Sequence, residues 1–388
     1  MTQEINKQKL FLASCMSLVV TAMAFGLRAG MVNSWASEFG LSIEQVGWIN
    51  GTAFYGFTLA MIVGGPLCDV IGMKRLIYIA FGGHLLGTIM TIFATGFWPL
   101  YISTLMIGIA NGMVEAACNP LVATIHSDEK TKYLNRFHVW FPGGIVIGGL
   151  LGYFMSNMGM SWQVQIATML IPTAIYGYLF FPEKFPVTER VSSGVSTGDM
   201  FKAALTPLFI FMVGCMLITA STELGTNQLI SKLLESTGVS PLLVLVYISA
   251  LMMLGRTFAG NFVHALSPAG MLLFSAIFST LGLLWLSMAT GMTTFAAATV
   301  FAVGICFFWP TMLGFVAEYL PKTGALGLSI MGGAGMLSVS FVLPILGKAL
   351  DNQSGSDTLR FYSILPGVLI LAFAGLYFYS KNQKSAHS

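Results

Sequence analysis

Charged residues are scarce in this chain. Only 9% of its 388 residues are Asp, Glu, Lys or Arg, whereas soluble domains carry about 25%. Hydrophobic residues make up 56% of the chain, and its mean hydropathy is +0.80. These values exclude an ordinary soluble protein and predict an integral protein that crosses the lipid bilayer several times. The formal net charge of +3 gives no sign of nucleic-acid binding, because the positive charges lie in short loops.

The chain also lacks the short motifs of nucleotide-driven and metal-dependent proteins. It contains neither a GxxxxGK[ST] phosphate-binding loop nor an HExxH metal motif. Its five cysteines all fall within apolar segments, which argues against a disulfide framework or a metal site: Cys15, Cys68, Cys118, Cys215 and Cys306. We predict that the protein is not an enzyme, that it uses no cofactor and no metal, and that an ion gradient rather than ATP drives it.

Apolar runs long enough to cross a bilayer occur twelve times, since a spanning helix needs roughly 20 residues. The first run follows Lys7 and Lys9 in the manner of a signal peptide, but it continues for more than twenty residues without a clear cleavage site. We interpret it as a retained first helix. The predicted spans are 10–36, 43–70, 76–97, 99–126, 136–158, 161–182, 205–234, 241–266, 268–290, 293–319, 324–348 and 359–380.

The basic residues orient these spans. With the N-terminus in the cytoplasm, the inner segments hold 13 of the 18 Lys and Arg residues, and the outer segments hold only Lys232, Lys348 and Arg360. Cytoplasmic loops carry an excess of positive charge, so both termini are predicted to be cytoplasmic, in a membrane that we take to be the bacterial inner membrane.

The longest polar stretch divides the chain into two halves of six spans each. It reads PEKFPVTERVSSGVSTGDM and separates a first bundle over 1–182 from a second over 205–388, with a cytoplasmic linker over 183–204. Two such halves with the substrate bound between them are a common transporter plan. A monomer is sufficient for this plan.

The loop after the second predicted span reads GPLCDVIGMKR. It resembles the loop between helices 2 and 3 of the major facilitator superfamily. Glycine allows close helix packing and a tight turn, and Asp69 can pair with basic groups or a helix end. The other interpretation is an ordinary basic loop, but the span count and the sidedness favour the resemblance. It implies an all-α membrane protein, with twelve transmembrane helices in two six-helix bundles, and a role in conformational gating for Gly65, Asp69, Gly72, Lys74 and Arg75.

A narrower resemblance covers most of the chain. GIANGMVEAACNP, followed by LNRFHVWFPGG, is similar to the fourth and fifth helices of the fucose/glucose/galactose–proton symporter family, and TASTELGTN resembles its acid-bearing seventh helix. The family's fucose transporter carries a proton-binding aspartate on helix 1. Here FGLRAGMVNSW has Arg28 and no acid, so a coupling role on the first span does not carry over and the substrate can differ.

Two of the fifteen acids, Glu115 and Glu223, lie in the middle of predicted spans, and Arg28 is the corresponding base. Ionisable residues within the membrane mark substrate or ion pathways. The superfamily resemblance implies that helices 1, 4, 7 and 10 line the central cavity, and all three charges lie on that set. We predict that Glu115 and Glu223 couple transport to protons. The alternative is that Glu115 and Arg28 form a static buried ion pair.

Amide side chains lie near these charges and extend the candidate site. Asn111, Glu115 and Asn119 are four residues apart and are expected to share one face. His138 is a candidate proton relay, Trp309 either stacks on a ring of the substrate or only packs, and Arg256 is interpreted as a gate or interhelix contact. The predicted substrate-binding set is Arg28, Asn111, Glu115, Asn119, His138, Glu223, Asn227, Gln228 and Trp309.

The leading hypothesis is proton-coupled symport of a sugar or sugar derivative by alternating access, with sodium as the other candidate coupling ion. The alternative is uptake of a sugar acid or organic anion through Arg28. Efflux of a drug or metabolite ranks lower, because PGGIVIGG matches the exporter motif of helix 5 only in part. A transport-inactive receptor is disfavoured by the short termini and the absence of a soluble domain.

Overall fold

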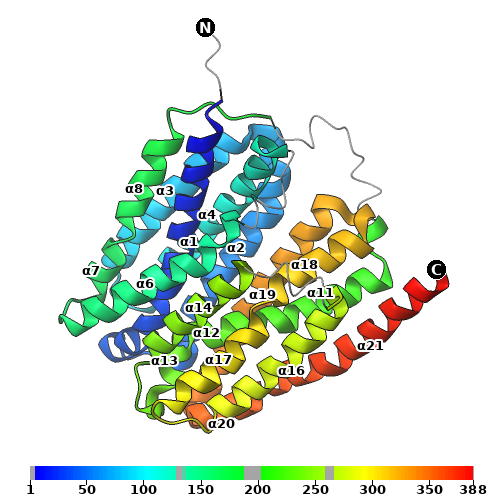
Figure 1. The fold of residues 1–388 in the computed structure, drawn as a ribbon. Helices are drawn as coiled ribbons and strands as arrows, with labels where there is room; N and C mark the ends of the chain where they lie inside the picture. Colours follow the sequence, from blue (N-terminus) through cyan, green and yellow to red (C-terminus); the bar gives the residue numbers. More distant parts are fainter. Residues whose placement is uncertain (1–4, 128–132, 134–135, 188–201, 258–265, 388) are drawn as a thin grey trace. The chain divides into compact units, whose positions relative to one another are not determined.

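The computed structural model describes residues 5–127, 133, 136–187, 202–257 and 266–387. Nearly all of these residues are helical, and no strand occurs among them. The chain forms two compact units, Met1–Val195 and Ser196–Ser388. This architecture confirms the predicted all-α membrane fold (Figure 1). The predicted linker over 183–204 falls largely outside the described residues.

The first unit is built around its first helix. Helix α1 is buried along most of its length and packs against α4, α6 and α8. Gly148 of α6 explains the close approach to α1, because a Cβ at this position would lie only 2.6 Å from the carbonyl oxygen of Met23. The helices of this unit are α1 (Lys7–Phe39), α2 (Ile43–Ile71), α3 (Met73–Ile92), α4 (Phe97–Ile125), α6 (Trp140–Asn157), α7 (Trp162–Ala167) and α8 (Leu170–Phe180).

Two turns at the ends of α2 follow directly from the sequence. Gly40 ends α1 with a φ of 62°, and Ser42 begins α2 with a capping box, in which Ser42 and Gln45 exchange side-chain and backbone hydrogen bonds. At its other end α2 is joined to α3 by Gly72 alone, with φ 87° and ψ 151°. Only glycine adopts this conformation without strain, which accounts for the second glycine of GPLCDVIGMKR.

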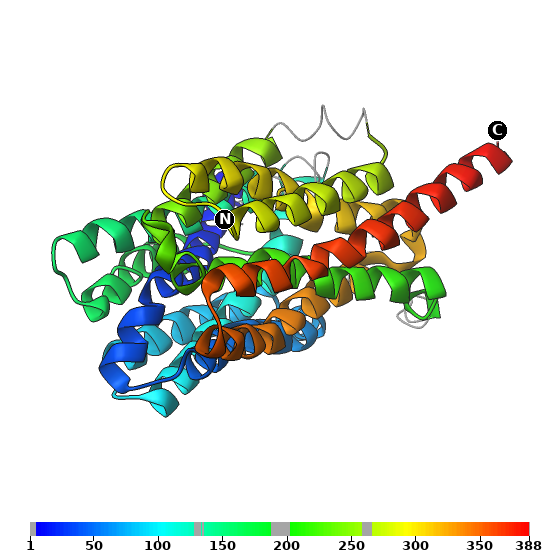
Figure 2. The same ribbon diagram turned by 90° about the horizontal axis from the view of Figure 1, so that it is seen from below.

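The second unit contains a distorted seventh span and a long last helix. The span begins with α11 (Pro207–Ala220), passes through a π-helical turn, Ser221–Gly225, and continues as α12 (Thr226–Gln228) and α13 (Ile230–Leu233). Figure 2 shows the length of α21, which packs against α16. The remaining helices are α14 (Pro241–Thr257), α16 (Pro268–Leu286), α17 (Thr293–Ile305), α18 (Phe308–Tyr319), α19 (Gly324–Asn352), α20 (Gly355–Tyr362) and α21 (Ile364–His387), with short 3₁₀ turns at Glu235–Thr237 and Pro321–Thr323.

Ten helical segments among the described residues are long and apolar enough to cross a membrane, and α14 is a shorter apolar helix. The sequence predicts twelve spans. The span predicted over 161–182 is divided at Thr168 and Met169 into α7 and α8, so neither piece reaches spanning length alone. In the span predicted over 241–266, residues 258–265 lie outside the described part of the chain.

Candidate functional site

Arg28 is the most unusual side chain of the first unit. It is 1% exposed, and its three guanidinium nitrogens have no hydrogen-bond partner among the described residues. Its Cζ lies 4.9 Å from the centroid of the Phe25 ring, three residues earlier on the same face of α1. A cation–π contact compensates only part of the cost of burying a charge. The arrangement therefore suits a partner that brings negative charge.

Glu115 is not that partner. Its carboxylate accepts a hydrogen bond of 2.6 Å from Nδ2 of Asn119 and lies 4.0 Å from Nε2 of His138. No ion pair joins Glu115 to Arg28 in the described part of the chain. The alternative predicted from the sequence, a static ion pair between Glu115 and Arg28, is therefore wrong.

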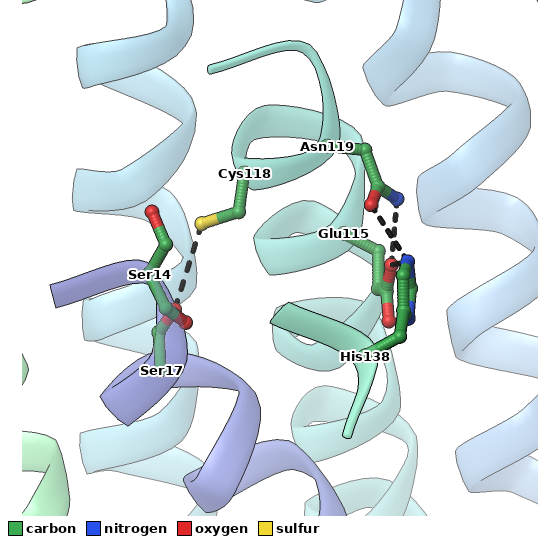
Figure 3. Close-up of polar contacts among 6 residues, drawn as sticks. All are labelled: Ser14, Ser17, Glu115, Cys118, Asn119 and His138. Atoms are coloured by element: carbon green, nitrogen blue, oxygen red, sulfur yellow. Dashed lines mark hydrogen bonds and ion pairs between the residues drawn. The ribbon is translucent and has the colours of Figure 1, made fainter. Parts of the chain in front are cut away.

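Glu115, Asn119 and His138 instead form a small polar network between α4 and the turn before α6 (Figure 3). The Oδ1 atom of Asn119 accepts a hydrogen bond of 3.0 Å from Nε2 of His138, which fixes the proton of the neutral imidazole on Nε2. The His138 side chain is 41% exposed and that of Glu115 only 8%. The network therefore leads from an accessible imidazole to a buried carboxylate. Ser17 and Cys118 lie 3.5 Å apart at the neighbouring contact of α1 and α4.

Asn111 belongs to a different network. Its Oδ1 accepts a hydrogen bond of 2.8 Å from Nε2 of His84 on α3, and Nδ1 of His84 in turn accepts one of 3.0 Å from the Tyr176 hydroxyl on α8. All three side chains are fully buried. A step of four residues overshoots a helical turn by about 40°, so Asn111 and Asn119 point about 80° apart. The single stripe predicted for Asn111, Glu115 and Asn119 therefore divides into two networks, and the acceptor of Asn111 is already used.

Glu223 has its own partner in the second unit. Nη2 of Arg256 on α14 lies 3.3 Å from Oε1 of Glu223, and Nε of Arg256 donates to the carbonyl oxygen of Cys306 at 3.1 Å. The sequence predicts a gate or an interhelix contact at Arg256. The interhelix contact is present, but it is an ion pair with the predicted coupling residue. No short motif indicates a pair 33 residues apart; the only signal is that charges within a membrane pair with one another.

The backbone around Glu223 is a π-helical turn. Glu223 is its central residue, and the Tyr362 hydroxyl of α20 donates a hydrogen bond of 2.6 Å to the carbonyl oxygen of Ser221. Gly225 packs directly on that hydroxyl, without room for a Cβ. π-Turns are frequent at functional sites. Sequence reasoning missed this one, because nothing in STELG distinguishes a π-turn from an α-helix.

The other predicted residues of the second unit differ in their surroundings. Asn227 and Gln228 are buried just after the π-turn, and Oδ1 of Asn227 has no hydrogen-bond partner among the described residues. The half-buried Trp309 packs against the glycine face of α19, where a Cβ at Gly335 would lie 3.0 Å from Cζ3 of its ring. Of the two interpretations of Trp309, packing is the one that its contacts favour.

Residues of the GPLCDVIGMKR loop contact the ends of other helices in the first unit. Nζ of Lys74 donates to the carbonyl oxygen of Glu183 just after α8 at 2.8 Å, and the Glu183 carboxylate pairs with Lys9 of α1 at 2.8 Å. Arg75 is exposed, and the side chain of Asp69 lies outside the described part. Gly65 does not support the packing argument, because a Cβ there would meet no atom within 4 Å.

Comparisons with known proteins agree with this architecture. The model of the Major Facilitator Superfamily matches residues 10–322. The chain is 25% identical over 161 residues to a D-xylose transporter of Levilactobacillus brevis, covering 41% of this chain and 35% of the relative. It is 26% identical over 177 residues to a cis,cis-muconate transport protein of Acinetobacter baylyi, covering 45% and 42%. These matches thus span less than half the length of either relative.

The fold is similar to that of a solved structure, a D-xylose–proton symporter. The TM-score is 0.79 at 14% identity, and the match covers 94% of this chain and 96% of the symporter. At that identity the likeness concerns the fold alone.

Proposed function

The chain belongs to the Major Facilitator Superfamily, and from this premise we propose that it takes up a small organic acid, such as a sugar acid, together with a proton. The chain is an integral membrane transporter and not an enzyme. The proposal concerns the class of substrate, the coupling ion and the direction of transport.

The observation that carries the proposal is the state of Arg28. A guanidinium has five N–H donors and stays charged under all physiological conditions. Arg28 is 1% exposed and has no hydrogen-bond partner among the described residues. It can therefore donate two parallel hydrogen bonds to one carboxylate, the arrangement in which arginine binds most strongly. A substrate carboxylate would supply the negative charge that Glu115 does not provide. The muconate transport protein among the relatives is named for an organic acid, which supports this class.

The network of Glu115, Asn119 and His138 supports proton coupling. A carboxylate that is buried, hydrogen-bonded and connected to an accessible imidazole can take up and release a proton, as the carboxylate and histidine relays of pumps and transporters do. The named activity of the D-xylose–proton symporter that shares the fold favours a proton over sodium. Glu223 and its partner Arg256 are the second candidate coupling pair.

We place both termini in the cytoplasm of a bacterial inner membrane, from the distribution of Lys and Arg. Two six-helix halves would then expose the substrate site alternately to the two sides of the membrane, as in transporters built from such repeats. A single chain suffices for this mechanism.

A neutral sugar is the second candidate substrate. It is favoured by the D-xylose transporter among the relatives and by Oδ1 of Asn227, which has no hydrogen-bond partner among the described residues and suits a hydroxyl. In this case Arg28 would donate to sugar hydroxyls, and its charge would remain uncompensated in the loaded transporter.

Uptake into proteoliposomes under an imposed pH gradient tests the proposal. Sugar acids, simple organic acids and neutral hexoses are compared for the parent protein, Arg28→Met and Arg28→Lys. We expect acids to accumulate in the parent. Arg28→Met should abolish this uptake, and Arg28→Lys should weaken it, because an ammonium lacks the planar fork of a guanidinium. Accumulation of neutral hexoses but not of acids would establish the second candidate instead. Net export of the substrate would show that the proposed direction of transport is wrong.

A further inference from the structure

Asn50 of α2, like Arg28, is a buried polar side chain without a hydrogen-bond partner among the described residues. It is 0% exposed, and neither its Oδ1 nor its Nδ2 forms a hydrogen bond with any described residue. Buried polar side chains are nearly always hydrogen-bonded, and leaving one unsatisfied destabilises the folded protein. A buried amide whose oxygen and nitrogen both lack a partner among the described residues is suited to bind a polar ligand.

The packing of two phenylalanines relates Asn50 to Arg28. Phe54 lies one turn after Asn50 on the same face of α2, and its ring centroid is 4.8 Å from that of Phe25 on α1. Arg28 lies over the Phe25 ring. The antiparallel helices α1 and α2 are joined by the turn that follows Gly40, and both Arg28 and Asn50 lie on the side of the ring pair that is nearer to this turn. The two side chains, neither of which has a hydrogen-bond partner among the described residues, therefore lie on the same side of one aromatic contact.

The two side chains have complementary chemistry. A guanidinium only donates hydrogen bonds, whereas an amide both donates and accepts. A hydroxyl group also does both, so an amide is a natural partner for it. An aliphatic acid without hydroxyls would leave Asn50 unsatisfied after Arg28 had bound its carboxylate.

We propose that Asn50 is a specificity residue for a hydroxylated organic acid, whose carboxylate binds Arg28 and one of whose hydroxyls binds Asn50. This inference rests on the proposed function and narrows its substrate class. It also brings α2 into the substrate site, in addition to α1. The Phe25 and Phe54 rings provide an apolar surface beside the two polar contacts.

Binding to the purified full-length protein tests the inference with acids matched in carbon number. Calorimetry compares gluconate with hexanoate, and glycerate with propanoate, for the parent and four variants. In the parent, the hydroxylated acid of at least one pair should bind more tightly. Leucine is similar to asparagine in volume but apolar. Asn50→Leu should weaken binding of the hydroxylated acid by about tenfold, the equivalent of one hydrogen bond. The affinity for the unhydroxylated acid of the same pair should not change. Arg28→Met should abolish binding of both.

Thr88→Val is the matched control. Thr88 on α3 is also fully buried, and its hydroxyl has no partner among the described residues, so the substitution likewise removes an unpartnered polar atom. It should change neither affinity. Asn50→Leu should melt at the parent's temperature or above, because an unsatisfied amide is replaced by an apolar group. Asn50→Ala provides the same binding comparison should the leucine not be accommodated.

The outcomes separate this inference from the proposed function. If Asn50→Leu and Asn50→Ala keep the full preference for the hydroxylated acid while Arg28→Met loses both acids, the role of Asn50 is wrong and the function stands. A parent that binds the two acids of each pair equally well would likewise overturn the role of Asn50 alone. If the parent binds no acid, the proposed function fails and the inference fails with it.

Discussion

Asn119 holds the carboxylate of Glu115 from the next turn of the same helix, with 2.6 Å between Nδ2 and Oε2. The same amide accepts a hydrogen bond from His138 through its oxygen. A change in the protonation of Glu115 would therefore alter the hydrogen bond of His138, because the Asn119 side chain contacts both residues. Substitutions at Glu115 and at His138 can therefore test whether the two residues have separate roles.

The first prediction concerns Glu115→Gln. The new amide can still accept the hydrogen bond of Asn119, but it cannot carry a proton. We expect substrate accumulation driven by a pH gradient to fall to simple equilibration, while exchange of external for internal substrate continues. Uptake and exchange in proteoliposomes measure the two activities side by side.

Glu235→Gln is the control for this change, because Glu235 is an exposed acid paired with Lys232 at the surface, where ion pairs contribute little. It should leave both activities unchanged. Gradient-driven accumulation that survives in Glu115→Gln would remove Glu115 from the coupling mechanism.

The second prediction concerns His138. Glutamine at this position keeps a donor for Oδ1 of Asn119 but does not titrate, whereas alanine removes the hydrogen bond as well. We expect His138→Gln to bind substrate like the parent and to lose much of the pH dependence of uptake, because glutamine cannot relay a proton. His138→Ala should also weaken binding. Should His138→Gln retain the parent's pH profile, His138 only positions Asn119.

Local spacing predicts some of the interactions around these residues and not others. The contact of Glu115 with Asn119 follows from their separation of four residues, and the conformation of Gly72 follows from its place between two spans. The Glu223–Arg256 pair depends on how α14 packs against the seventh span, which no local pattern specifies. The contact of His84 with Asn111 depends in the same way on the packing of α3 against α4.

Asn50 was missed for a different reason. Acids and bases within a span are rare enough to stand out singly, whereas the amides predicted for the site all lie within five residues of Glu115 or Glu223. Asn50 stands alone in WINGTAF, seven residues after the start of the span predicted over 43–70. Its position within a span is a signal that the sequence carries, but only the structure shows that its amide has no protein partner among the described residues.

The third prediction concerns the Glu223–Arg256 pair. Their side chains are 7% and 16% exposed, so removing one partner leaves a charge with little access to water. We expect Arg256→Met to lower the free energy of unfolding by about 3–5 kcal/mol. The double variant Arg256→Met/Glu223→Gln should recover much of this loss, because neither charge remains. Thermal unfolding in detergent measures both effects; equal stability of the single and double variants would mean that the pair is not coupled.

The fourth prediction compares two glycines of one motif. Gly72 has φ 87° and ψ 151°, a region open essentially only to glycine, so Gly72→Ala should lower the free energy of unfolding by about 1–3 kcal/mol. Gly65 lies within α2, where a Cβ would meet no atom within 4 Å. Gly65→Ala should therefore be neutral or stabilising by about 0.5–1 kcal/mol, since alanine is the better helix former.

Chemical unfolding of the two single variants decides whether the motif's glycines have the same role. A large loss in Gly65→Ala would show that Gly65 is needed for a close approach in another conformation of the transporter. Uptake separates the two positions further. If Gly72 serves only the α2–α3 turn, Gly72→Ala should reduce the amount of folded transporter without changing the rate per folded molecule. A rate that falls at unchanged folded yield would instead place Gly72 in the conformational cycle.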